Sequence, residues 1–237
     1  MGYVLGLVLL LCPLFSPAVQ ASENLATLIT QARTLDRDAV SSTRQRFTDA
    51  QITGFINDAQ RQAMATTHCL TGSMTFSLLP GVTYYALPSN FLSMDRVTLA
   101  QVGNIMEMSP GALDGRSRGW ELTSGHPVYY FINFSSRGLL GFAPFPQTAG
   151  DTDTVKAEFY IQANDLASPT DLPYNGAGEF QDYHQGLAYY AAALMAAIDG
   201  QGTQSTGFMS VFSGTVGTMK ARCMERPRYM PSAAGTQ

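Results

Sequence analysis

Charged side chains are scarce in this sequence. They make up 14% of the residues, and the formal net charge is -4. A protein that neutralises nucleic-acid phosphates needs clustered Lys and Arg. The nearest approach to a cluster is Lys220, Arg222, Arg226 and Arg228 near the C-terminus, and cations are favoured at the end of a helix. The low charge therefore argues against phosphate binding and, together with 11% aromatic residues, indicates a surface that is hidden in an assembly.

Residues that carry catalysis or bind metals are equally few. The histidines are His68, His126 and His184, and none accompanies a Gly-x-Ser-x-Gly elbow or a cysteine nucleophile. The carboxylates on both sides of residues 164–178 form no Asp-x-Asp-x-Asp-Gly loop for calcium. We therefore predict no catalytic residue, no cofactor, no metal ligand and no enzyme activity.

Cysteines are too few for a disulfide framework. Cys12, Cys69 and Cys223 also do not have the spacing of metal ligands. Because Cys69 and Cys223 each lie at the end of a predicted helix, we interpret both as buried thiols.

An apolar run long enough to span a membrane is absent. Val4 to Leu11 is short, and the small residues of Ala18-Val19-Gln20-Ala21 fit a signal-peptidase site. No Lys or Arg precedes Arg33, however, so the positive start of a secretory leader is missing. Residues 1–21 are therefore either a leader-like segment or an N-terminal extension, and both interpretations stay open.

Helical spacing of apolar residues begins after this segment. It predicts a first helix over about residues 24–38 and a second over residues 48–67, which starts with the capping-box pair Thr48 and Gln51. We expect the other face of the second helix to meet water or a neighbouring subunit. Its polar residues are Asp49, Asn57, Asp58, Gln60, Arg61 and Gln62.

Two further helices are predicted at the C-terminal end. They follow a linker over residues 164–178 and span about residues 180–200 and 203–223. Each half of the chain thus has one apolar helical stripe, and we expect the two halves to pack together.

Residues 73–163 consist of short runs with β-type alternation. No long helix separates one run from the next, so we predict an antiparallel sheet that forms a small sandwich or barrel of about eight strands. Three hairpins are expected: 74–78 with 82–87, 95–102 with 105–108, and 128–134 with 139–143.

The predicted fold class is α+β, with a helical bundle domain interrupted by an antiparallel β-sandwich or barrel insertion. The predicted parts are a leader-like or N-terminal extension (1–21), a helical domain (22–70 and 179–224), a β insertion domain (72–164) and a C-terminal tail (225–237).

The third hairpin has two largely apolar faces. The interior of a barrel covers one face only, so we expect part of this hairpin to contact another subunit. The tail beyond Cys223 mixes Arg and aromatic residues between prolines, and we expect it to order against a neighbour. The interface candidates are Tyr129, Phe131, Phe134, Arg226, Arg228 and Tyr229.

Four short phrases occur in a characteristic order. They are FINDAQRQ at residues 55–62, Tyr85-x-Leu87-Pro88-x-x-Phe91, Gly125-x-Pro127-x-x-Tyr130 and Phe142-x-Pro144-x-Pro146, and two closing helices follow up to Lys220. In their order and spacing, over about residues 24–222, they make the sequence resemble the head-to-tail adaptor (connector) proteins of tailed bacteriophages.

The resemblance implies a structural protein of the virion neck. It implies a ring, usually dodecameric, that sits beneath the portal, continues the DNA channel and docks the tail. The implied partners are further copies of the chain, the portal protein, and a tail, nozzle or head-closure protein, while packaged DNA passes through without sequence-specific binding. A mildly acidic lining suits such a channel, because lysines would hold phosphates. The leader-like N-terminus departs from the family pattern and keeps an exported periplasmic or secreted β-rich binding protein as the alternative.

Overall fold

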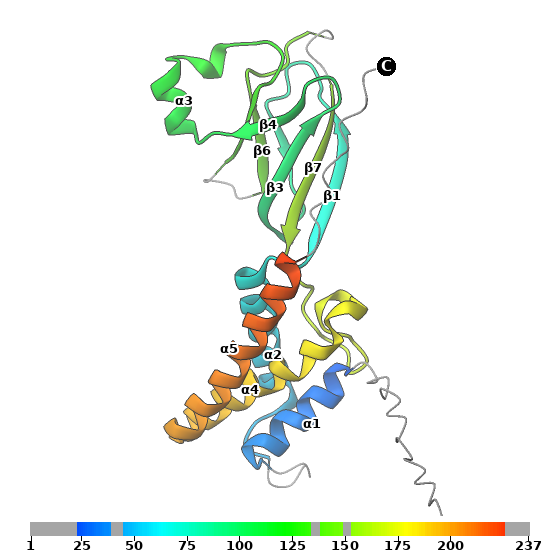
Figure 1. The fold of residues 1–237 in the computed structure, drawn as a ribbon, viewed down its shortest axis with the longest axis vertical. Helices are drawn as coiled ribbons and strands as arrows, with labels where there is room; N and C mark the ends of the chain where they lie inside the picture. Colours follow the sequence, from blue (N-terminus) through cyan, green and yellow to red (C-terminus); the bar gives the residue numbers. More distant parts are fainter. Residues whose placement is uncertain (1–22, 39–44, 134–137, 149–152, 226–237) are drawn as a thin grey trace, which may run out of the picture.

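The computed structural model describes residues 23–38, 45–133, 138–148 and 153–225. The chain is elongated, with helices at one end and one curled sheet at the other (Figure 1). Its α-helices are α1 (Leu25–Asp36), α2 (Asp49–Thr67), α3 (Pro110–Arg116), α4 (His184–Ile198) and α5 (Gly202–Met224). The strands are β1 (Thr71–Ser77), β2 (Tyr84–Ala86), β3 (Phe91–Leu99), β4 (Gly103–Glu107), β5 (Tyr129–Ile132), β6 (Leu139–Ala143) and β7 (Thr154–Ile161). The α+β class is confirmed.

The long helices start where local chemistry predicts. Asn24 caps α1 by accepting a hydrogen bond from the backbone N–H of Thr27 at 3.0 Å. Thr48 and Gln51 form the reciprocal capping box at the start of α2. In the C-terminal part, the 3₁₀ segment Gly178–Tyr183 leads into α4, and α5 packs against α4.

Helix α4 is the centre of the helical end, and α1, α2 and α5 all pack on it. Small residues allow the close approach of α5. A Cβ atom added to Gly186 in α4 would lie 2.7 Å from Thr215 Cγ2 in α5, whereas one added to Gly214 on the exposed face of α5 would meet nothing within 4 Å. Gly186 is therefore required by packing, and Gly214 is not.

Replacing Gly186 by alanine should lower the free energy of unfolding by about 1–3 kcal/mol, because the new methyl group overpacks the contact between α4 and α5. The matched change Gly214→Ala should raise it by about 0.8–1 kcal/mol, because alanine is the better helix former. Chemical denaturation of both variants checks the pair. Equal effects in the two variants would show that α4 and α5 are not in close contact at Gly186.

The seven strands of the described chain form one sheet in the order β1-β7-β3-β4-β5-β6-β2. The antiparallel prediction is wrong for one pair, because β4 and β5 run parallel, with Met106 opposite Tyr129. A parallel pair needs a crossover connection, and residues 108–128, which contain α3, supply it. The sheet is therefore mixed, and the predicted sandwich is not confirmed.

Two of the three predicted hairpins are confirmed. Strands β3 and β4 pair as neighbours, and so do β5 and β6. The hairpin predicted over residues 74–87 is wrong, because β1 pairs with β7 and β2 pairs with β6, at opposite edges of the sheet. The curl brings these edges together through side chains: the rings of Phe76 and Tyr85 lie 4.7 Å apart. They close over a core that includes Leu99, Leu140 and Phe142.

The linker predicted over residues 164–178 is part of the helical core. Asn57 bonds both backbone groups of Leu166, at 3.0 and 2.8 Å. Gln60 accepts from the N–H of Tyr174 and donates to the carbonyl of Asn164, each at 2.7 Å. The prediction that Asn57 and Gln60 face water or a neighbour is therefore wrong, because these amides hold a packed loop.

Apolar side chains form separate clusters at the two ends. One joins α1, α2, α4 and α5 with the loop around Tyr174, and the second lies inside the curled sheet. Ile161, at the end of β7, packs against both. The division of the chain into a helical and a β domain stays a prediction.

Candidate functional site

The crossover between β4 and β5 forms a small lobe on the outer face of the sheet, visible beside the strands in Figure 1. Ser109 caps α3 by accepting from the N–H of Ala112, and Pro110 begins the helix. A 3₁₀ turn, Trp120–Leu122, follows, and the indole N–H of Trp120 donates to Asp114 at 2.8 Å. We call residues 108–128 the α3 lobe.

Phe131 lies under this lobe. Its side chain is 2% exposed and meets Trp120 edge to face at 5.1 Å, within a cluster that includes Leu113 and Ala143. A Cβ atom on Gly141 of β6 would overlap the Phe131 ring, so the glycine is what lets the ring lie flat on the sheet. The second apolar face of the hairpin is thus covered within the chain, and Phe131 offers no surface to a neighbour in this structure.

Tyr129 is half-buried at the margin of the same cluster. The Arg116 guanidinium lies 5.3 Å from its ring centre, a cation–π contact. A groove of about 280 Å³ opens beside it, lined among others by Trp120, Val128 and Pro144. Of the predicted interface residues that the structure describes, Tyr129 is the one that reaches the surface. Phe134, Arg226, Arg228 and Tyr229 lie outside the described residues.

Exposed apolar side chains occur in the α3 lobe and on the adjacent strand β4. Leu122 is 87% exposed, Met106 64% and Val128 46%. The sequence analysis did not identify these residues as an exposed group, because it assigned Met106 and Val128 to the strands of two hairpins. The signals that could have located the lobe are Pro110 at a helix start and the lone tryptophan, Trp120, beside an apolar strand.

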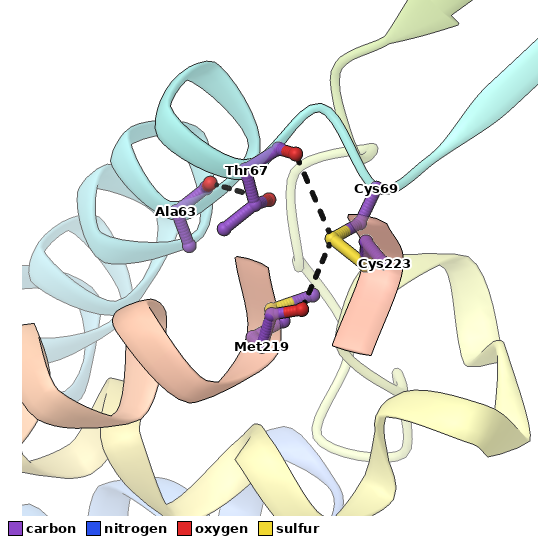
Figure 2. Close-up of a disulfide and its surroundings, with 5 residues drawn as sticks. All are labelled: Ala63, Thr67, Cys69, Met219 and Cys223. Atoms are coloured by element: carbon purple, nitrogen blue, oxygen red, sulfur yellow. Dashed lines mark hydrogen bonds between the residues drawn. A yellow bond between two sulfur atoms is a disulfide. The ribbon is translucent and has the colours of Figure 1, made fainter. Parts of the chain in front are cut away.

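A second feature is a covalent link between the start of the sheet and the last long helix. Figure 2 shows the disulfide between Cys69, in the connection from α2 to β1, and Cys223, in the last turn of α5. The Cα atoms are 5.6 Å apart. The interpretation of these residues as separate buried thiols is wrong, because the fold brings positions that are 154 residues apart into one contact.

The histidines of the chain lie apart from one another. His68 caps the C-terminus of α2 and meets the Tyr160 ring edge to face, and His126 lies 3.9 Å from the carboxylate of Asp153. His184 is buried at the start of α4, and its Nδ1 is 3.2 Å from the carbonyl of Glu23. Within the described ranges, no three His, Cys, Asp or Glu side chains are grouped so that they could hold a metal ion.

Burial sets the electrostatics of the groups near the two cores. It lowers the pKa of His184, and in the sheet it raises the pKa of Tyr130 to about 12, with a contribution from the nearby Glu107 carboxylate. Each shift favours the neutral form, as expected for a group that loses solvent. These groups therefore act as packing residues at neutral pH.

The stability of the chain should fall as the pH drops below about 6.5, the value at which histidine titrates in an unfolded chain. The reason is that the unfolded chain then binds a proton that folded His184 resists, because its pKa is lowered. Measuring the free energy of unfolding from pH 7.5 to 5.5 should give a slope of up to about 1.4 kcal/mol per pH unit. The variant His184→Gln should lose this slope, and an unchanged slope would contradict the assignment.

Packing between apolar surfaces, rather than a polar reaction centre, dominates the described chain. These features are typical of structural and interaction proteins. A family model described as SU10 adaptor protein matches residues 23–235, and the chain therefore belongs to the SU10 adaptor protein family. The family consists of structural adaptors of bacteriophage virions, consistent with the head-to-tail adaptors that the sequence resembles. A search of curated proteins finds no match. In the described residues, no helix is both long and apolar enough to cross a membrane.

Proposed function

We propose that copies of this chain form a ring beneath the portal, which continues the DNA channel and docks the tail. The observation that carries the proposal is the family match over residues 23–235. It agrees with the low charge of the chain and with the exposed apolar residues of the α3 lobe, because each subunit of a ring buries surface on two flanks. A dodecamer is the expected ring, and no enzyme activity is expected.

In this proposal, DNA passes through the ring without sequence-specific binding. Within the chain, positive charge is scarce, and the formal net charge is -4. A lining with few Lys and Arg makes few phosphate contacts, so DNA slides past it. The partners in this proposal are the portal on one side and a tail or head-closure protein on the other.

The test combines the mass of the complex with the phenotype of particles that lack the protein. The purified chain, alone or with the portal, should have the mass of a ring by light scattering. Particles without the chain should package DNA but fail to retain it or to gain tails. A chain that stays monomeric in the presence of portal, together with normal tails in its absence, would refute the proposal.

The Cys69–Cys223 disulfide favours one alternative, an exported β-rich binding protein, since disulfides persist mainly in oxidising compartments. N-terminal sequencing of the native protein separates the two proposals. A mature start near Ser22 on a soluble monomer would favour export, and presence of the chain in purified particles favours the adaptor.

A further inference from the structure

The Cys69–Cys223 disulfide lies where the helical end meets the sheet. Among the described residues, the chain passes between these ends twice, at residues 68–70 and at 162–163. The disulfide ties a third segment, the end of α5, to the first of these passages (Figure 1). It therefore fixes the position of α5 relative to the base of β1.

We propose that Cys69 and Cys223 are a redox modification site: both are thiols while the chain folds and assembles, and oxidation after release from the host cell locks α5 to the helix–sheet junction. This inference rests on the proposed function, because a phage structural protein is made in the bacterial cytoplasm, where thiols are kept reduced.

The surroundings of Cys69 suit a thiol as well as a disulfide. Its side chain is buried, and the carbonyl oxygens of Thr67 and Met219 lie 3.9 and 3.7 Å from its sulfur (Figure 2). A reduced Cys69 can donate its S–H to either carbonyl, so reduction leaves no buried donor without an acceptor. The thiol form is therefore compatible with the same fold.

Apolar packing holds the end of α5 without the covalent bond. Met219 is 1% exposed and belongs to the same core cluster as Met64 of α2, and Cys223 packs against that cluster. Because these contacts position the two sulfurs, the reduced chain is prepared for disulfide formation.

Cys223 is the sulfur that a reagent reaches first, because it is partly exposed while Cys69 is buried. The oxidant is a small-molecule disulfide. The Cys223 thiolate attacks it, forms a mixed disulfide and releases one small thiolate. The Cys69 thiolate then attacks the Cys223 sulfur and releases the second small thiolate. The two protons lost by the cysteines end on the two released thiols, so the pair loses two electrons and the small disulfide gains them.

The disulfide should stabilise the fold mainly by restricting the unfolded chain. A bond between residues 154 apart removes a large share of the freedom of the unfolded state. The oxidised chain should therefore melt roughly 5 to 15 °C above the reduced chain, with the same circular dichroism below the transition.

The first experiment traps thiols at two times. Infected cells are quenched with acid and N-ethylmaleimide before lysis, and purified particles are treated in the same way. Mass spectrometry should find Cys69 and Cys223 alkylated in the cells and linked in the particles. A linked pair before lysis, or free thiols in the particles, would overturn the inference. Absence of the chain from the particles would instead refute the proposed function.

The second experiment uses the purified chain, so it tests the inference whether or not the chain is found in particles. The variant Cys223→Ser should fold and melt like the reduced parent, whatever the redox buffer. The control Cys12→Ser, at a position outside the described residues, should keep the difference between oxidised and reduced forms. A reduced parent that is unfolded would contradict the inference, because the bond would then be needed for folding rather than added to a finished fold.

Discussion

Replacing Arg33 by alanine should lower the free energy of unfolding by about 3–5 kcal/mol, the usual cost of removing one partner of a buried ion pair. Arg33 is 2% exposed. Its guanidinium donates to Asp38 at 2.5 Å, to the Phe47 carbonyl at 2.8 Å and to Asp49 at 2.6 Å. The Asp38 side chain is 1% exposed, so in the variant its buried carboxylate would lose the ion pair with the Arg33 guanidinium.

Arg33 also determines how the chain enters α2. Its bonds to Phe47 and Asp49 hold the residues just before and just inside that helix against α1. Loss of these bonds should therefore loosen the contact between α1 and α2 as well as expose a buried charge. Urea denaturation, with the parent and variant in the same redox state, measures the effect.

Arg61 provides the matched control. It also bonds two carboxylates, those of Asp58 and Asp165, but its side chain is 43% exposed. Exposed ion pairs contribute about 0–1 kcal/mol, so Arg61→Ala should be nearly neutral. If Arg33→Ala cost no more than Arg61→Ala, the burial of the Arg33 network would not contribute to stability.

The sequence correctly predicted features that depend only on residues close together in the chain. The capping box at Thr48 needs contacts over three residues, and the hairpin of β5 and β6 needs one short turn. Arg33 shows the limit of this approach, because a cation in the last turn of a helix looks like a surface residue. Its burial depends on Asp38, Phe47 and Asp49, which the fold brings together.

Partners far apart in the chain could not be predicted in the same way. Period-two alternation marks β1 and β2 as strands, but it does not say which strand each one meets. Polar side chains on α2 gave a similar error: Gln60 is buried because a loop more than a hundred residues away supplies the backbone groups it bonds. The Cys69–Cys223 disulfide was missed for the same reason. The sequence shows the two cysteines, but it does not show that the fold brings them together.

For the candidate site, the sequence identified the strand that carries Tyr129 and Phe131, but not the α3 lobe that packs on it. Tyr129 and Phe131 both lie on β5 as predicted. Tyr129 and Phe131 are two residues apart and so lie on the same face of β5. The α3 lobe packs over Phe131 and leaves Tyr129 at its margin. The surface available to a partner is therefore the rim of the lobe, which includes Val128.

Replacing Phe131 by aspartate should destabilise the chain by about 4 kcal/mol or more, because it removes a buried ring and places a carboxylate among Leu113, Trp120 and Ala143. Trp120 is the one tryptophan of the chain and touches Phe131 directly, so its fluorescence reports on this cluster. We expect its emission to shift to the red as the α3 lobe detaches from the sheet. An unshifted emission and an unchanged denaturation midpoint would show that the lobe does not cover Phe131.

Val128→Asp separates assembly from folding at the same hairpin. Val128 precedes β5, is 46% exposed and lines the groove beside Trp120. A carboxylate there stays in water in the monomer, so Trp120 emission and the denaturation midpoint should match those of the parent. If the rim of the lobe contacts a neighbouring subunit or the next tail component, the charge loses its solvent on assembly and particles should lose tails or DNA. Particles of this variant that are as infectious as the parent would show that the hairpin is not an assembly surface, because the fold itself is left intact.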